Sequence, residues 1–129
     1  FEYGAAFDMG YEFGQGVDLH GENATKAASK AILNAMSHCC MCGTTEIPAA
    51  CGKKGALEIL IQVGVPRHEQ VDSASLYALL PDQSAQVRIE VTEGGLIAEG
   101  AYAPAYGEGT HILIADAVIT VWLIDFAQE

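Results

Sequence analysis

A two-residue alternation over residues 7–19 constrains the fold of this chain more than any other feature of its sequence. Odd positions in this segment are mostly apolar, whereas even positions hold acidic residues and glycine. Successive side chains of a β-strand point to opposite faces, so the pattern predicts a half-buried strand. Residues 1–6 precede the pattern and are expected to be irregular.

Two helices are predicted after this strand. Asn23 is a suitable N-cap for a helix over residues 23–40, in which alanine, isoleucine and methionine recur along one face. Asp72 or Ser73 begins a second, shorter helix that ends near residue 80, before a proline. Each helix presents one apolar face and therefore needs a sheet to cover.

Three more strands are predicted, over residues 57–65, 87–91 and 112–126, and the intervals 44–55 and 96–110 read as loops. The chain is long enough for one core and too short for two ordinary domains, so residues 1–129 are expected to form a single domain. The element order is β-α-β-α-β-β. With right-handed crossovers this order predicts an α+β fold, a mixed four-stranded sheet with both helices on one face.

Two helices on one face leave the other face of the sheet to water or to a neighbouring subunit. The last predicted strand is apolar on both sides, which favours a neighbour, either in a homo-oligomer (a trimer or a multiple) or in a larger protein assembly. Asp116 interrupts this strand. It is either a buried carboxylate, with a partner or a raised pKa, or a residue turned outward by a bulge or bend, and both interpretations stay open.

Composition excludes several classes of partner. Seventeen acidic against six basic residues give a net charge of −11, which disfavours nucleic acid and anionic membranes. The longest apolar run, residues 112–126, is broken by polar residues, so no membrane span is expected. The chain begins at Phe1 without a methionine and without a signal-peptide pattern, so a segment upstream of Phe1 is expected to have been removed or not to have been seen.

The four cysteines favour free thiols over a disulfide framework or a metal site. Cys39, Cys40 and Cys42 crowd the end of the first predicted helix, and Cys51 lies in the following loop. A zinc site that includes His38 is the alternative, but a single CxxC pair is weak evidence. We therefore predict no metal, no cofactor and a reducing compartment, either cytoplasm or plastid stroma.

The most probable functional centre by sequence is the segment 14–21, which reads GQGVDLHG. On an extended strand the two glycines leave bare backbone on the face that carries Asp18 and His20, so a ligand could approach closely. An aspartate that orients a histidine is a recurrent acid–base arrangement, which makes Asp18 and His20 the predicted catalytic pair. The predicted ligand-binding residues are Gly14, Gly16, Gly21, Asn23 and Lys26.

A helix start beside His20 favours a small anionic ligand, because its free N–H groups and a lysine attract negative charge. The structural alternative is that Asp18 accepts loop N–H bonds, that His20 closes the turn, and that Lys26 and Lys30 lie on a solvated face. Further residues that could line the same pocket, or close over it, are Glu46, Glu58, Glu93, His111, Tyr102 and Tyr106.

The GxGxDxHG pattern resembles the hallmark of an uncharacterised conserved-hypothetical family, the Lin family, found in bacteria, cyanobacteria and plants. The resemblance extends from residue 7 over most of the chain. It implies a site at this loop but no reaction, and the long N-terminal extensions of the plant members suggest an organelle-targeting segment. The topology is also similar to chorismate-mutase-like and ferredoxin-like folds, and chorismate-mutase-like trimers place their sites between subunits.

Two functions therefore stay open at the level of sequence. The first is a small-molecule enzyme or binder, with its site near a subunit interface and with Asp18 and His20 for proton transfer. The second is a non-catalytic subunit that packs through its open sheet face into an assembly. The two functions make different predictions for the motif: its side chains either line an open pocket or are buried in the packed interior.

Overall fold

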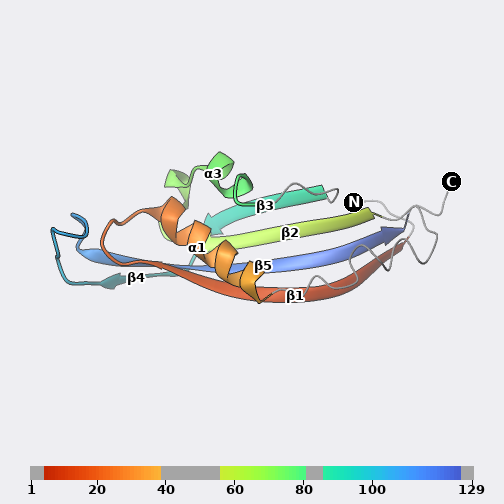
Figure 1. Ribbon diagram of the computed structural model, residues 1–129, viewed down its shortest axis with the longest axis horizontal. Coiled ribbons are helices and arrows are strands. Elements are labelled where there is room, and N and C mark those ends of the chain that lie inside the picture. The colour runs from red at the N-terminus through yellow and green to blue at the C-terminus, as the bar shows by residue number, and fades with distance from the viewer. Residues whose placement is uncertain (1–4, 39–55, 81–85, 126–129) are drawn as a thin grey trace.

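The structure is a computed structural model that describes residues 5–38, 56–80 and 86–125. Figure 1 shows a long twisted sheet with the helices lying against it. In chain order the elements are β1 (Ala5–Asp18), α1 (Ala24–Ser37), β2 (Ala56–Val65), the 3₁₀ turn η1 (His68–Gln70), α3 (Ser73–Tyr77), β3 (Gln86–Glu93), β4 (Leu96–Glu99) and β5 (His111–Asp125).

The strands form one mixed sheet in the order β1-β5-β2-β3, with β4 also paired to β5. Only β2 and β3 run parallel, and β5 is antiparallel to β1, β2 and β4. The predicted α+β class and mixed sheet are confirmed, but the sheet has five strands where four were expected.

The additional strand, β4, occupies part of the segment that was predicted to be a loop. Pairing of β2 along β5 ends at Gly64, opposite Asp116, and β4 begins opposite Ile114. To reach that place the chain crosses the end of β2, where a Cβ on Gly94 would lie 3.0 Å from the Cα of Gly64. Strand β4 pairs with β5 beyond the point where β2 ends. It has only four residues, so its alternation of side chains is too short to identify a strand from the sequence.

Helix α1 supplies most of the cover for the sheet. Asn23 is its N-cap, as predicted, and the side-chain oxygen accepts a hydrogen bond from the Lys26 N–H at 3.0 Å. Its alanine-rich face is buried against β1, β5 and β2, and α3 packs beside it, so both helices lie on one face. The core between them consists of Ala24, Ala27, Ala28, Ala31, Ile32, Ala35, Ile59, Ile61, Val63, Val65, Leu76, Leu113, Ala115, Ala117, Ile119 and Val121.

The opposite face of the sheet carries no helix among the described residues, and we call it the open face. It is formed by the side chains that alternate with the core residues of each strand, so Phe13 of β1 and its cross-strand neighbour Val118 of β5 both belong to it. Asp116 also lies there and is exposed in regular register, without the bulge that one interpretation required. Within the described residues no helix is long and apolar enough to cross a membrane.

Candidate functional site

The glycine face of β1, predicted to be open for a ligand, is covered by α1. A Cβ on Gly14 would lie 2.8 Å from the Cα of Ala35, and one on Gly16 would lie 2.8 Å from the carbonyl carbon of Lys30, with other backbone atoms of α1 closer still. The backbone expected to be open at Gly14 and Gly16 is therefore occupied by α1, and ligand binding by these glycines stays a prediction. These glycines lack a side chain because a helix backbone packs directly on the strand.

Side chains of α1 also hold the outer edge of β1. The side-chain oxygen of Asn34 accepts the Gln15 N–H at 2.9 Å, and the Lys30 ammonium donates to the Val17 carbonyl at 3.1 Å. Lys30 therefore has a structural partner in the strand. The helix both covers β1 and satisfies part of its free edge.

Asp18 is 3% exposed and acts within the turn that leads into α1. Its carboxylate accepts the Asn23 N–H at 2.8 Å and lies 3.9 Å from the Lys26 ammonium. A Cβ on Gly21 would lie 3.0 Å from the same carboxylate. The anion expected near the helix start is thus present as Asp18 itself, and these contacts agree with the structural alternative for Asp18, Gly21, Asn23 and Lys26.

His20 has different partners from Asp18. Its ring stacks on Tyr106 with centroids 5.5 Å apart, and its carbonyl accepts the Gly109 N–H at 2.6 Å. The ring atom Nδ1 is buried and has no hydrogen-bond partner among the residues that the structure describes. Such an unpaired polar atom is uncommon and costs free energy unless another group satisfies it. His20, rather than the glycines, is the part of the motif with unused hydrogen-bonding capacity.

Glu22 joins three segments at this end of the sheet, and no sequence pattern had singled it out. One carboxylate oxygen lies 2.9 Å from the Arg67 guanidinium and 3.9 Å from Nδ1 of His111, and the other accepts the Thr110 N–H at 2.7 Å. The hydrogen bond from Thr110, followed by that from Arg67, lowers the pKa of Glu22 below its ordinary value. Both Glu22 and Arg67 have positive φ, at 48° and 59°, a conformation that non-glycine residues adopt rarely.

A second group of ionisable side chains lies beside Arg67. Nδ1 of His68 is 2.8 Å from the carboxylate of Glu93 and 3.4 Å from that of Glu69. The backbone N–H groups of Arg67 and His68 also donate to Glu93. The hydrogen bond from the His68 side chain lowers the pKa of Glu93 most, and the backbone bonds add to it. The nitrogen or oxygen atoms with which His68, Glu69 and Glu93 could bind a metal all lie within 4.8 Å of one another. Among the described residues, these three side chains are the group that could hold a metal ion.

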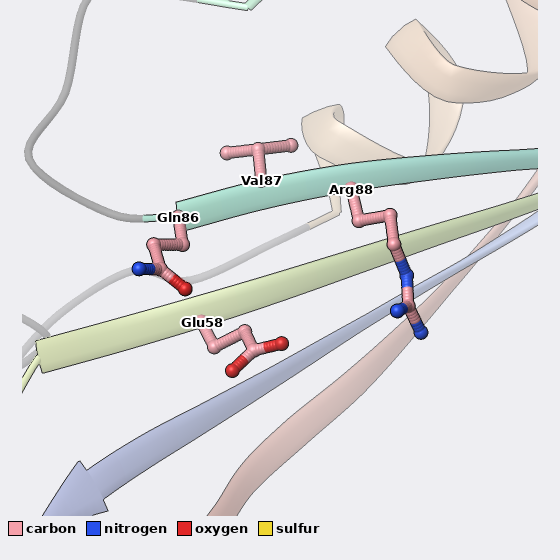
Figure 2. Close-up of a pocket in the computed structure, with 4 residues that line it drawn as sticks. All are labelled: Glu58, Gln86, Val87 and Arg88. Atoms are coloured by element: carbon pink, nitrogen blue, oxygen red, sulfur yellow. The ribbon is translucent and has the colours of Figure 1, made fainter. Parts of the chain in front are cut away.

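Glu58, one of the residues that could have lined a pocket with His20, lies far from it along the sheet. It pairs with Trp122 near the far end of β5, whereas Asp18 pairs with Leu113 near its start. There, Glu58 lines a shallow pocket of about 240 Å³ with Gln86, Val87 and Arg88. Figure 2 shows the Glu58 carboxylate between the side chains of Gln86 and Arg88, with Val87 turned to the other side of the sheet.

Some of the remaining candidate residues are described by the structure, and others lie outside its described ranges. His111 approaches Glu22, and Tyr106 covers His20, so both lie at the motif end of the sheet. Tyr102 is 59% exposed. Glu46 and the four cysteines, Cys39, Cys40, Cys42 and Cys51, lie outside the described residues.

Comparison with known proteins gives a family without an assigned activity. A family model described as a conserved hypothetical protein (Lin0512) matches residues 8–121. The crystal structure of an FtsZ-like protein of unknown function from Nostoc punctiforme is similar, with 35% identity and a TM-score of 0.78, covering 94% of this chain and 98% of that one. No curated protein matches. On the extent of the family match, the chain belongs to the Lin0512 family of conserved hypothetical proteins.

Proposed function

We propose that the chain is a non-catalytic subunit that packs through its open face into a larger assembly. The observation that carries this proposal is the exposure of two aromatic side chains of β1 on that face, 55% for Tyr11 and 67% for Phe13. Large apolar side chains that gather on one face of a sheet are a feature of interaction surfaces.

The contacts of the motif support the same proposal. Gly14 and Gly16 admit the backbone of α1, and Asp18 fixes the turn by which the chain enters that helix. With α1 held on this side of β1, the aromatic side chains of the strand have to point to the opposite side. The motif thereby determines which face of the sheet is available to a partner.

Size-exclusion chromatography of cell extract containing the tagged chain tests this proposal. We expect the wild-type chain to elute well above its own mass of 13.6 kDa, and Phe13→Glu to elute near that mass. Leu33→Glu is the matched control, because Leu33 is 47% exposed and lies on α1, away from the open face. A wild-type chain that elutes at monomer size in extract would contradict the proposal.

Binding of a small molecule, with or without acid–base chemistry, is the second candidate function. One observation favours it: Nδ1 of His20 is buried, and within residues 5–38, 56–80 and 86–125 it has no hydrogen-bond partner. A small anionic metabolite is the ligand class we propose, because the Lys26 side chain is 58% exposed beside the motif turn. A thermal-shift screen tests it: His20→Ala should retain the wild-type melting temperature but lose the response to any hit.

We further propose a reducing compartment, either cytoplasm or plastid stroma. Three of the four cysteines crowd four consecutive positions, an arrangement unlike the disulfide frameworks of secreted proteins. Purified protein should therefore show four titratable thiols after denaturation and contain no stoichiometric zinc. Intact-mass evidence for disulfides, or one zinc per chain by elemental analysis, would contradict this assignment.

A further inference from the structure

The open face divides into an apolar half and a charged half. The apolar half lies over β1, β5 and β4, where the register places Phe13 opposite Val118, and both Val17 and Leu96 opposite Ile114. It comprises Tyr11, Phe13, Val17, Leu96, Ile114 and Val118, with the polar pair Gln15 and Asp116 opposite one another among them. Leu96 is 58% exposed, so the apolar surface continues from the edge strand β1 to β4.

The charged half lies over β2 and β3, and its side chains already contact one another. The Arg88 guanidinium is 3.2 Å from the Glu90 carboxylate, and the Gln62 amide donates to Glu90 at 3.5 Å. Burying these charged groups would cost desolvation free energy, and exposed ion pairs contribute too little to offset it. The charged half is therefore suited to the rim of an interface, and the apolar half to its centre.

Contact through the edge of β1 is hindered. Strand addition requires free backbone groups, but the Gln15 N–H is bonded to Asn34 and the Val17 carbonyl to Lys30. A partner that covers Tyr11 and Phe13 must therefore approach the face of the sheet.

Charge favours this face for contact between identical chains. Two copies of a chain with net charge −11 repel one another unless they meet where carboxylates are scarce. Among the described side chains of the apolar half, only Asp116 is charged. Two copies that meet through it bring together the fewest like charges.

The open face also approaches the size of a stable protein–protein interface. Four strands about 4.8 Å apart and ten residues long, at about 3.3 Å per residue, cover on the order of 600 Å². A stable interface of standard size buries about 800 Å² on each partner. The open face comes close to this value without any contribution from the loops at its ends.

We infer that the partner on the open face is a second copy of this chain, with the two sheets stacked face to face and the apolar halves in contact. This inference rests on the proposed function and names the partner. Tyr11 and Phe13 lie inside the contact, whereas Arg88 and Glu90 lie at its rim. Association strengthens as salt rises, because salt screens the repulsion between two acidic chains and leaves apolar contact intact.

A photo-crosslinking residue in place of Phe13 tests the inference, with the same residue in place of Leu33 as the control. In purified protein we expect light scattering to give at least a dimer, and crosslinking at position 13 to give a product of twice 13.6 kDa. Position 33 should give no such product. Phe13→Glu should yield a monomer with the helical circular dichroism of the wild type, which separates lost contact from lost fold.

The possible failures are distinguishable. A purified chain that is monomeric at high micromolar concentration, and that crosslinks in cells only to a different protein from position 13, overturns the second-copy inference and retains the assembly proposal. No crosslink from position 13, in purified protein or in cells, overturns both. A dimer whose crosslink forms from position 33 and not from position 13 overturns the inferred surface.

Discussion

The two faces of β1 differ in a way that hydrophobicity alone would predict wrongly. The covered face carries Gly14, Gly16 and Asp18, and the open face carries Tyr11 and Phe13. Within one chain, the small and polar side of the strand is buried and the aromatic side is exposed. The reason is steric: the backbone of α1 reaches β1 only where the strand has no side chains, whereas aromatic residues there would hold the helix away.

The largest expected effect comes from filling the covered face. Gly16→Val places a side chain into backbone atoms of α1, which cannot give way as the end of a side chain can. We expect a loss of about 3 kcal/mol or more in the free energy of unfolding. Chemical denaturation measures it. Gln15→Ala, at the neighbouring exposed position, should change stability by less than about 0.5 kcal/mol; equal effects of the two substitutions would contradict the assignment of faces.

The end of the covered face should show the next largest effect. Asp18→Ala removes the buried acceptor of the Asn23 N–H, and we expect a loss of about 1–2 kcal/mol. Lys26→Ala should cost less than about 0.5 kcal/mol, because the ammonium is exposed and 3.9 Å from Asp18. Wild-type stability in Asp18→Ala, combined with a lost ligand response, would instead identify Asp18 as part of a binding site.

Lowering the pH should reveal how much Glu22, which lies in the turn after β1, contributes to the stability of the fold. Its pKa is lowered in the folded chain, so ionised Glu22 stabilises the fold above its unfolded pKa, and this contribution disappears as pH falls through the folded pKa. Glu22→Gln should therefore lower the melting temperature at neutral pH, and the difference should narrow below pH 4.5, the ordinary value for this group. Glu99→Gln, in the exposed strand β4, serves as the control; a pH-independent difference would show that charge is not the cause.

The smallest effect on the fold is expected on the open face. Phe13→Ser removes an aromatic ring that is 67% exposed in the single chain. At high dilution the free energy of unfolding should therefore change by less than about 0.5 kcal/mol. At high protein concentration the same substitution should lower the apparent stability, because the wild type gains stability by association. A large loss at high dilution would mean that Phe13 packs within its own chain.

Local sequence signals identified several elements correctly. Asn23 identified the start of α1, and the apolar alternation before Pro66 identified β2. The last strand, predicted over residues 112–126, is observed over His111–Asp125. The second helix was predicted to reach residue 80 but ends at Tyr77, and Pro81 limits its extent without fixing its last turn. Strand β4 was missed because its pairing with β5 depends on where β2 ends.

The contacts of the candidate site were less accessible to sequence reasoning. Glu22 and Arg67 lie 45 positions apart, and their ion pair forms because β1 and β2, on either side of β5, both finish at the same end of the sheet. Asp18 and His20 are two positions apart, yet the chain turns between them, so one bonds Asn23 and the other stacks on Tyr106. Spacing along a strand predicts a shared face only while the strand continues, and β1 ends at Asp18.

By itself, the sequence determined the class of fold, the positions of most elements and the family, because strand alternation, helix capping and the GxGxDxHG pattern are local properties of the chain. Only the tertiary structure decided which face of β1 is buried, and with it the role of Gly14 and Gly16. Alternation separates the residues of a strand into two sets but carries no information about which set meets a helix. That choice depends on how closely α1 can approach, which is a property of two segments packed together.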